Sequence, residues 1–338
     1  MNLGAVLDQI IKGEELTREQ AEELMTLLVN GEATHAQAGG ILIGLRAKGC
    51  TSRELAAFGK ILRQHVVPVS HCYDDLVDVV GTGGGSPSFN ISTGACIVAA
   101  AAGARVAKHG NRAVTSHCGS ADVLEALGVN LYADPEHLRT VLESCGIVFM
   151  LAPSHHPALR HISAPRRELG IRTVFNVLGP IVNPAGVIRQ VVGVYDRSLS
   201  RAAAEALLEL GATRTLVVHS DDGMDEISPV ARTHYVKVWG GAVEEGHFEP
   251  EDFGLSGVPE DVATPDKTVD GNAAILREAL GRADSPRSQA LIPSAATALW
   301  LAAKAEDLRA GAELARKAIA SGAALAKLHE LAEASQVG

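Results

Sequence analysis

The feature that most constrains the fold is a cluster of glycines between an apolar run and an alanine-rich segment. Residues 76–80 form a short apolar run, as in a buried strand, and residues 81–85 read Gly-Thr-Gly-Gly-Gly. Residues 94–102 then have strong helix propensity. A strand, a glycine turn and a helix N-terminus in this order expose backbone N–H groups to an anion. The segment predicts a phosphate-binding turn, with an ordinary structural turn as the alternative.

Polar side chains beside this turn favour the phosphate interpretation. Asn90, Ser92 and Thr93 can each donate a hydrogen bond to a phosphate oxygen next to the helix. A helix N-cap would explain Ser92 or Thr93, but not all three residues. The stretch is not a P-loop, because no lysine follows the glycines, and Ser86 replaces the last glycine of the dinucleotide-binding pattern.

Composition limits the partners of such a site. The net charge of −10 and the aromatic content of 4% argue against binding to nucleic acid. The chain of 338 residues is long enough for a large core and more than one domain. Five scattered cysteines without a C-x-x-C pair are typical of reduced thiols, and no apolar run has membrane-spanning length. We expect a soluble, cytoplasmic protein without a signal peptide.

Two domains are expected from the sequence pattern. Residues 1–70 predict a helical domain, because capping boxes begin at Thr17, Thr34 and Thr51; part of residues 165–190 is expected to complete it. Residues 71–338 alternate apolar runs with helical patterns, which predicts an α/β domain with a central, mostly parallel sheet. Strands are expected at 105–108, 147–151, 191–195 and 215–219, and a hairpin at 234–239 and 242–248. Helices are expected at 120–127, from 135, at 157–169 and within 286–335. A turn-rich crossing is expected at 175–184.

A second loop with anion-binding chemistry follows the predicted strand at 105–108. It reads Lys108-His109-Gly110-Asn111-Arg112, and hydroxyl groups follow in residues 115–120. A solvated charged turn is the alternative. Two such loops at the ends of neighbouring strands predict a diphosphate site. His117 and Cys118 lack partner ligands at zinc spacing, so a zinc site is not favoured.

Two charged segments complete the candidate site. Residues 221–226 read Asp-Asp-Gly-Met-Asp-Glu after a predicted strand, so they suit Mg²⁺ shared with phosphates, although a solvated acidic loop is the default. Residues 155–167 are rich in histidine and arginine, and a guanidinium there could clamp a carboxylate. The spacing does not choose between Arg166 and Arg167. No pattern of a covalent nucleophile is present.

These motifs, in this order and over nearly the whole chain, closely resemble the anthranilate phosphoribosyltransferase family. The most specific markers are Gly81-Thr82-Gly83-Gly84, Phe89-Asn90-Ile91-Ser92-Thr93, Lys108-His109-Gly110-Asn111-Arg112, Gly119-Ser120-Ala121-Asp122, His156-Pro157-Ala158, Arg166-Arg167-Glu168-Leu169-Gly170, Phe175-Asn176-x-Leu178-Gly179-Pro180 and Asp225-Glu226. The resemblance implies a fold like that of nucleoside phosphorylases and class IV phosphoribosyltransferases, usually as a homodimer. It also implies transfer of phosphoribose from phosphoribosyl pyrophosphate to the amine of anthranilate in tryptophan biosynthesis, with Mg²⁺.

The resemblance also implies roles for individual residues. Lys108 and Asn111 would be catalytic; Gly81, Asn111 and Arg166 would bind anthranilate, and Ser92, Asp225 and Glu226 would hold Mg²⁺. The residues that would bind the phosphoribosyl donor are Gly81, Gly84, Gly85, Ser88, Asn90, Ser92, Thr93, Lys108, His109, Gly110, Asn111, Arg112, Ser116 and Ser120.

The chain departs from the family pattern at two positions. Gly85 stands where the family loop commonly has an aspartate, which puts the number of bound metal ions in question. His117-Cys118 replaces a lysine-serine pair, so a fixed cation becomes one that titrates near pH 6.5 when unperturbed. We expect donor binding to weaken as pH rises through the pKa of His117.

Two alternatives stay open beside this interpretation. One is an enzyme like the pyrimidine nucleoside phosphorylases, and the other is a non-catalytic paralogue that binds nucleic acid. A nucleobase needs neither a carboxylate clamp at Arg166 nor Mg²⁺ at Asp225 and Glu226, and a nucleic-acid binder should be basic. Both features favour the transferase.

Overall fold

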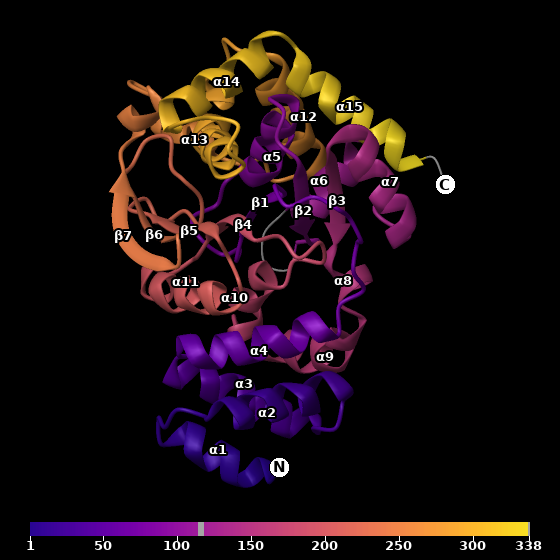
Figure 1. Cartoon of the computed structure of the whole chain (residues 1–338), viewed down its shortest axis with the longest axis vertical. Helices are drawn as coiled ribbons and strands as arrows, with labels where there is room; N and C mark the ends of the chain where they lie inside the picture. The colour runs from indigo at the N-terminus through magenta and orange to yellow at the C-terminus, as the bar shows by residue number, and fades with distance from the viewer. Residues whose placement is uncertain (114–117, 337–338) are drawn as a thin grey trace.

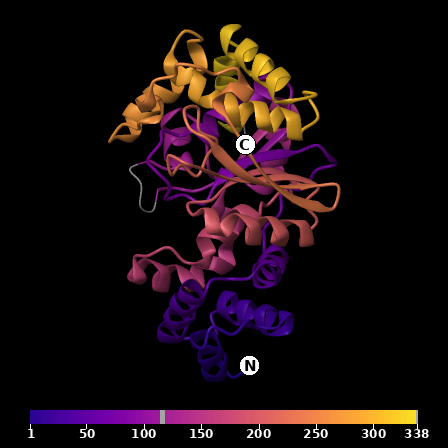
Figure 2. The ribbon, with the colours of Figure 1, turned by 90° about the vertical axis from the view of Figure 1, so that its left-hand side faces the viewer.

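A helical bundle lies at one end of an elongated molecule, and an α/β region forms the rest (Figures 1 and 2). The structure, a computed structural model, describes residues 1–113 and 118–336. The bundle contains α1 (Leu3–Ile11), α2 (Arg18–Asn30), α3 (His35–Lys48) and α4 (Ser52–Gln64). Among the described residues, no helix is long and apolar enough to span a membrane.

The bundle helices begin at the predicted capping boxes. The hydroxyls of Thr17, Thr34 and Thr51 each accept a hydrogen bond from the backbone N–H three residues later, and the Gln or Glu there caps in return. Glu54 does more than cap, because its buried carboxylate also pairs with Lys48 at 2.7 Å.

Seven strands of the described chain form one sheet in the order β3-β2-β1-β4-β5-β6-β7. The first five strands in this order are parallel, and β6 and β7 join as an antiparallel hairpin at one edge. This confirms the mostly parallel α/β sheet. The strands are β1 (Val77–Gly81), β2 (Val106–Gly110), β3 (Ile147–Leu151), β4 (Arg189–Gly193), β5 (Arg214–Ser220), β6 (Thr233–Trp239) and β7 (Ala242–Phe248).

Helices cover both faces of the sheet (Figure 1). They are α5 (Ile91–Ala101), α6 (Ser120–Ala126), α7 (Pro135–Cys145), α8 (Ala152–His155), α9 (Arg160–Leu169), α10 (Val174–Ile181), α11 (Ser200–Glu209), α12 (Val269–Gly281), α13 (Pro286–Leu301), α14 (Leu308–Ala320) and α15 (Ala323–Gln336), with short 3₁₀ turns at Pro157–Leu159, Arg197–Leu199, Pro250–Phe253 and Glu260–Ala263.

Alternate strand residues belong to two separate cores. Val191 and Leu216 pack with α5 and the C-terminal helices, whereas Val192 and Val217 pack with α10, α11 and the N-terminal bundle. The bundle therefore shares one continuous core with a face of the sheet. The division of the chain at residue 70 stays a prediction.

Two details differ from the sequence expectations. The strand expected at 191–195 is β4, which ends at Gly193, because the apolar run continues past the last ladder position. Residues 174–181 form helix α10 rather than a turn-rich crossing. Phe175, Leu178 and Ile181 recur at helical spacing and are buried, and the helix ends one residue after Pro180.

Candidate active site

The glycine loop after β1 and the acidic loop after β5 lie against each other. Their strands flank β4 in the parallel part of the sheet, so their carboxyl ends share one edge. The Gly83 N–H donates to Asp225 Oδ2 at 2.7 Å, and Ser88 Oγ donates to Glu226 Oε2 at 2.7 Å. The Ser92 N–H at the start of α5 donates to Glu226 Oε1 at 3.0 Å. Two segments more than a hundred residues apart thus form one polar centre.

Asp225 fits because glycines surround it. A Cβ at Gly81 would lie 2.5 Å from Asp225 Oδ2, and one at Gly85 would lie 2.6 Å from the Asp225 backbone N. A Cβ at Gly193, the last residue of β4, would overlap the Asp225 carbonyl oxygen. Gly85 has no room for the aspartate that the family loop commonly carries.

The charges of Asp225 and Glu226 are poorly compensated by the protein. Both side chains are partly open to the site and otherwise surrounded by protein. Burial, followed by repulsion from Asp225, raises the pKa of Glu226 to about 8. Burial also raises the pKa of Asp225, against hydrogen bonds from the Gly83 and Gly85 backbone. Two neighbouring carboxylates of this kind fit a cation.

The N-terminus of α5 carries polar atoms without partners. Asn90 is the N-cap residue, but its side chain makes no cap hydrogen bond. Asn90 Oδ1 and Thr93 Oγ1 are buried and have no hydrogen-bond partner among the described residues. Next to the positive end of the helix dipole, the Thr93 hydroxyl can donate to a phosphate oxygen, whereas Asn90 Oδ1 accepts and suits a hydroxyl group of a ligand.

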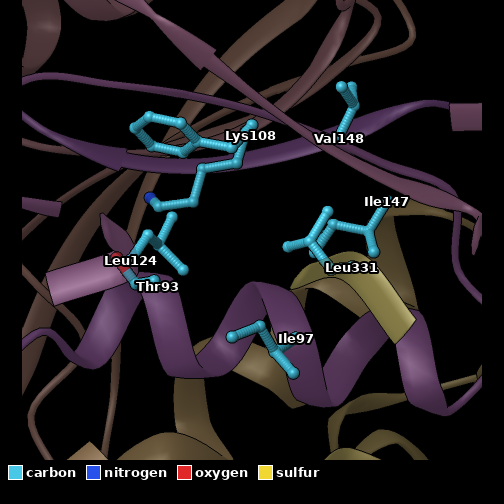
Figure 3. A pocket seen from close by; sticks show the side chains of 8 residues that line it. Thr93, Ile97, Lys108, Leu124, Ile147, Val148 and Leu331 are labelled. Atoms are coloured by element: carbon cyan, nitrogen blue, oxygen red, sulfur yellow. The ribbon is translucent and has the colours of Figure 1, made fainter. Parts of the chain in front are cut away.

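Lys108 is buried beneath this centre rather than exposed in its loop. Figure 3 shows its side chain running from β2 toward Thr93 on α5, beside a void of about 10 Å³ that has room for no more than one water molecule. Its Nζ donates to the Val79 carbonyl at 2.8 Å and lies 3.4 Å from Ser92 Oγ. The ammonium group therefore supplies positive charge behind Ser92.

Asp78 is a buried carboxylate to which the sequence analysis gave no role. It has 0% exposure, and burial raises its pKa to about 6, although Lys108 opposes the shift. Asn183 Nδ2 donates to Asp78 Oδ2 at 2.8 Å. An acid within an otherwise apolar strand was the available signal, because such a group needs a buried partner.

The loop after β2 is held from within. Ser120 Oγ accepts from the Asn111 N–H at 3.2 Å, and Asp122 Oδ2 accepts from the Gly119 N–H at 2.9 Å. The Arg112 guanidinium pairs with Asp122 at 3.0 Å and Glu125 at 2.8 Å, so carboxylates of α6 already bind it. The contacts of Arg112 and Ser120 with the phosphoribosyl donor stay predictions.

Ser116 and His117 lie outside the described residues. The expected pH dependence of phosphoribosyl-donor binding through His117 therefore stays a prediction. Two further residues are predicted to bind the phosphoribosyl donor. Gly84 lies in the glycine loop, and Gly110 is the last residue of β2.

Three histidines form a buried cluster between β2, α8 and α10. The His109 and His156 ring centroids lie 5.1 Å apart, and His155 Nδ1 lies 2.7 Å from the Val67 carbonyl oxygen. Burial lowers the pKa of His109 well below its usual value and that of His156 to about 4. His109 is therefore neutral near pH 7 and supplies no charge to a phosphate.

Arg166 differs from Arg167 in its surroundings. Its guanidinium is half-buried over the Phe175 ring, 5.3 Å from the centroid, and Arg167 is exposed. In the described part of the chain, the Arg166 side chain has no ion pair or hydrogen bond. Burial lowers the pKa of Arg166. An anion that paired with this cation would relieve the cost of its desolvation.

Comparisons with known proteins agree over the full length. Residues 5–66 match a family model described as glycosyl transferase family, helical bundle domain, and residues 73–325 match glycosyl transferase family, a/b domain. Anthranilate phosphoribosyltransferases of Stutzerimonas stutzeri and Thermomicrobium roseum are 43% and 47% identical over 98% and 97% of this chain, and 96% of each relative. The chain belongs to the anthranilate phosphoribosyltransferase family.

Solved structures of anthranilate phosphoribosyltransferases also match. The enzyme of Thermus thermophilus has a TM-score of 0.92 and 39% identity, and the match covers 100% of both chains. The Saccharomyces cerevisiae enzyme in complex with PRPP and Mg has a TM-score of 0.89 and 26% identity, and the match covers 99% of this chain and 98% of that one. The resemblance stated from the sequence motifs is confirmed.

A series of side-chain contacts that the sequence did not predict connects the helical bundle to the glycine loop. Arg46 on α3 donates to the Tyr195 hydroxyl at 2.8 Å, and the Arg172 guanidinium lies 4.5 Å from the Tyr195 ring centroid. Arg172 also donates to the Gly84 carbonyl. No local motif indicates this link, because it joins the bundle to the glycine loop only through the tertiary fold.

Substitution at Gly85 tests the packing of the glycine loop. Because a Cβ there would meet the Asp225 backbone, Gly85→Ala and Gly85→Asp should each displace the acidic loop and raise the donor KM at least about tenfold. Steady-state kinetics would measure this. Gly39→Ala on the bundle, where a Cβ meets nothing within 4 Å, is the control. An unchanged donor KM in Gly85→Asp would contradict the packing argument.

The histidine cluster predicts a loss of stability in acid. The pKa of His156 is about 4 in the folded protein, below the ordinary value of 6.5, so the unfolded chain takes up the proton first. The destabilisation from His156 is absent above pH 6.5 and should reach about 3 kcal/mol by pH 4. His109 and His155 should add to it, because their pKa values are also lowered. Urea unfolding at several pH values would measure it. His156→Gln should flatten this dependence, and an equal slope in that variant would contradict the assignment.

Proposed function

We propose that the chain transfers the phosphoribosyl group of 5-phosphoribosyl 1-pyrophosphate to the amine of anthranilate, giving N-(5-phosphoribosyl)anthranilate and pyrophosphate in L-tryptophan biosynthesis. The observation that carries this proposal is the pair Asp225 and Glu226, held against the glycine loop and the N-terminus of α5. A full-length relationship to anthranilate phosphoribosyltransferases supports it. A nucleoside phosphorylase or a nucleic-acid-binding paralogue is not favoured.

The donor is assigned to the glycine loop and α5. Its phosphate oxygens would accept from backbone N–H groups at the helix N-terminus and from the Thr93 hydroxyl, and Asn90 Oδ1 would accept from a ribose hydroxyl. Lys108 lies behind Ser92, where its charge stabilises the pyrophosphate as the bond from the ribose carbon to oxygen breaks. Preorganised charge is effective here because it needs no rearrangement during the reaction.

Mg²⁺ is the proposed cofactor, held by Asp225, Glu226 and Ser92. The residues fit this ion, because two adjacent carboxylates offer hard oxygen ligands and their pKa values stay raised although Arg172 and Lys108 oppose the shifts. When bound, Mg²⁺ neutralises negative charge on the leaving pyrophosphate.

Anthranilate is assigned to Arg166, with Asn111 and Gly81 as further contacts. The carboxylate would pair with the unpartnered guanidinium and so orient the amine. The amine nitrogen then bonds to the anomeric carbon, the carbon–oxygen bond to pyrophosphate breaks, and the nitrogen loses one proton. An aromatic amine is weakly basic and releases this proton readily, so no strong base or covalent enzyme intermediate is required. A cytoplasmic homodimer is part of the same proposal.

Turnover tests the activity directly. We expect anthranilate fluorescence to fall when the purified chain receives phosphoribosyl pyrophosphate and Mg²⁺, and to stay constant with EDTA. Asp225→Asn with Glu226→Gln should remove the Mg²⁺-dependent rise in melting temperature as well as turnover, because the proposed ligands lose their charge. Asp221→Asn, on an exposed residue of the same loop, is the control. A folded chain without turnover would contradict the proposed function.

Arg166 and Arg167 provide a matched pair for the acceptor site. Arg166→Gln should raise the anthranilate KM about 30- to 100-fold, since a charged hydrogen bond contributes roughly 2–3 kcal/mol. Arg167→Gln should leave it within about twofold, because that side chain is exposed. Equal effects of the two substitutions on the anthranilate KM would refute the assignment.

A further inference from the structure

A hollow of about 450 Å³ opens at the sheet edge opposite the candidate active site. Its lining residues are Arg214, Trp239, Trp300, Ala303, Lys304, Ala305 and Glu306. Arg214 is the first residue of β5, and Ser220, at the other end of the strand, precedes the acidic loop. A strand of this length spans roughly 20 Å, so the hollow is a separate place on the molecule.

Both tryptophans of the chain line this hollow. Trp239 ends β6 and Trp300 lies at the end of α13, and their rings stack with centroids 4.9 Å apart and an interplanar angle of 25°. Each side chain is only half-buried. The exposed parts of the two indoles can contact a further aromatic ring.

Cations gather at the same edge. The Arg214 guanidinium lies 4.6 Å from the Trp239 ring centroid and has no ion pair in residues 1–113 and 118–336. The strand register sets Arg189 beside Arg214, and the Arg189 guanidinium donates through Nη1 to the Leu301 carbonyl at 3.4 Å. Lys304 forms a long ion pair with Asp75, with 3.4 Å between Nζ and Oδ2. In an acidic chain, the Arg214 guanidinium, without an ion pair among the described residues, favours an anion in this hollow.

One wall of the hollow is the turn that ends α13. Ala303, just after α13, has φ of 58°, the single positive value at a non-glycine position in the described chain. Glycine would adopt this conformation at lower cost. The turn that closes α13 accounts for this conformation, because the Ala303 N–H donates to the Trp300 carbonyl at 3.1 Å and the Lys304 N–H donates to the Leu299 carbonyl at 2.9 Å.

We propose that this hollow binds a small aromatic carboxylate, with its ring against the indoles and its carboxylate on Arg214. Lys304 would add positive charge on the same side. Glu306, the acidic residue of the lining, would accept an ammonium group where the ligand is an aromatic amino acid. Simple aromatic acids and aromatic amino acids share the ring and carboxylate that the site recognises.

Intrinsic fluorescence excited at 295 nm tests this in the full chain, because both tryptophans line the hollow. Titration with benzoate or with L-phenylalanine should give a saturable change, whereas uncharged benzamide should give none. Tighter binding of benzoate would identify simple acids as ligands, and tighter binding of L-phenylalanine would identify amino acids. No saturable change with either probe, or an equal response to benzamide, would overturn the proposal.

Substitutions locate the response. Arg214→Gln should weaken benzoate binding at least about tenfold and leave anthranilate turnover unchanged. Arg277→Gln, on an exposed residue of α12, is the matched control. Arg166→Gln should leave the titration unchanged, which separates the hollow from the acceptor site. If Arg214→Gln does not fold, Glu306→Gln should strengthen benzoate binding. Wild-type affinity in the folded Arg214 variant, or in the Glu306 variant, would refute the assignment.

Discussion

The candidate site depends on the passage of the acidic loop across the ends of the parallel strands. Asp225 lies so close to Gly81, Gly85 and Gly193 that a single methyl group at any of these positions would collide with it. The three glycines come from two strand ends and a turn. Because close packing tolerates no such overlap, the carboxylates of the acidic loop can approach the glycine loop only where side chains are missing.

Charge burial is the second constraint, and it explains why the site is poised for ligands. Asp78, Asp225 and Glu226 have raised pKa values because each is largely removed from water. Lys108 is the buried cation that faces this group, and its Nζ already donates to Val79 and Ser92. A desolvated anionic centre of this kind favours a divalent cation, which in turn favours an anionic donor.

The shared core of bundle and sheet determines how the acceptor side is built. α9 and α10 carry Arg166 and Phe175 and pack in the same core as the N-terminal helices. Arg46, Tyr195 and Arg172 extend this connection to the glycine loop. The bundle therefore connects to the glycine loop through these three side chains. None of the residues predicted to bind substrate or metal lies in α1 to α4.

The sequence by itself determined the local features. Capping boxes at Thr17, Thr34 and Thr51, the strand–glycine–helix order after Leu76 and the family motifs all depend on neighbours within a few residues, so the fold class and family could be predicted. Only the tertiary structure decided which distant groups meet: Asn183 with the buried Asp78, Arg112 paired with α6, Arg166 over the Phe175 ring, and the tryptophan-lined hollow. Burial and pairing arise when elements far apart in the chain pack together, and no local pattern encodes the electrostatic environment that this packing creates.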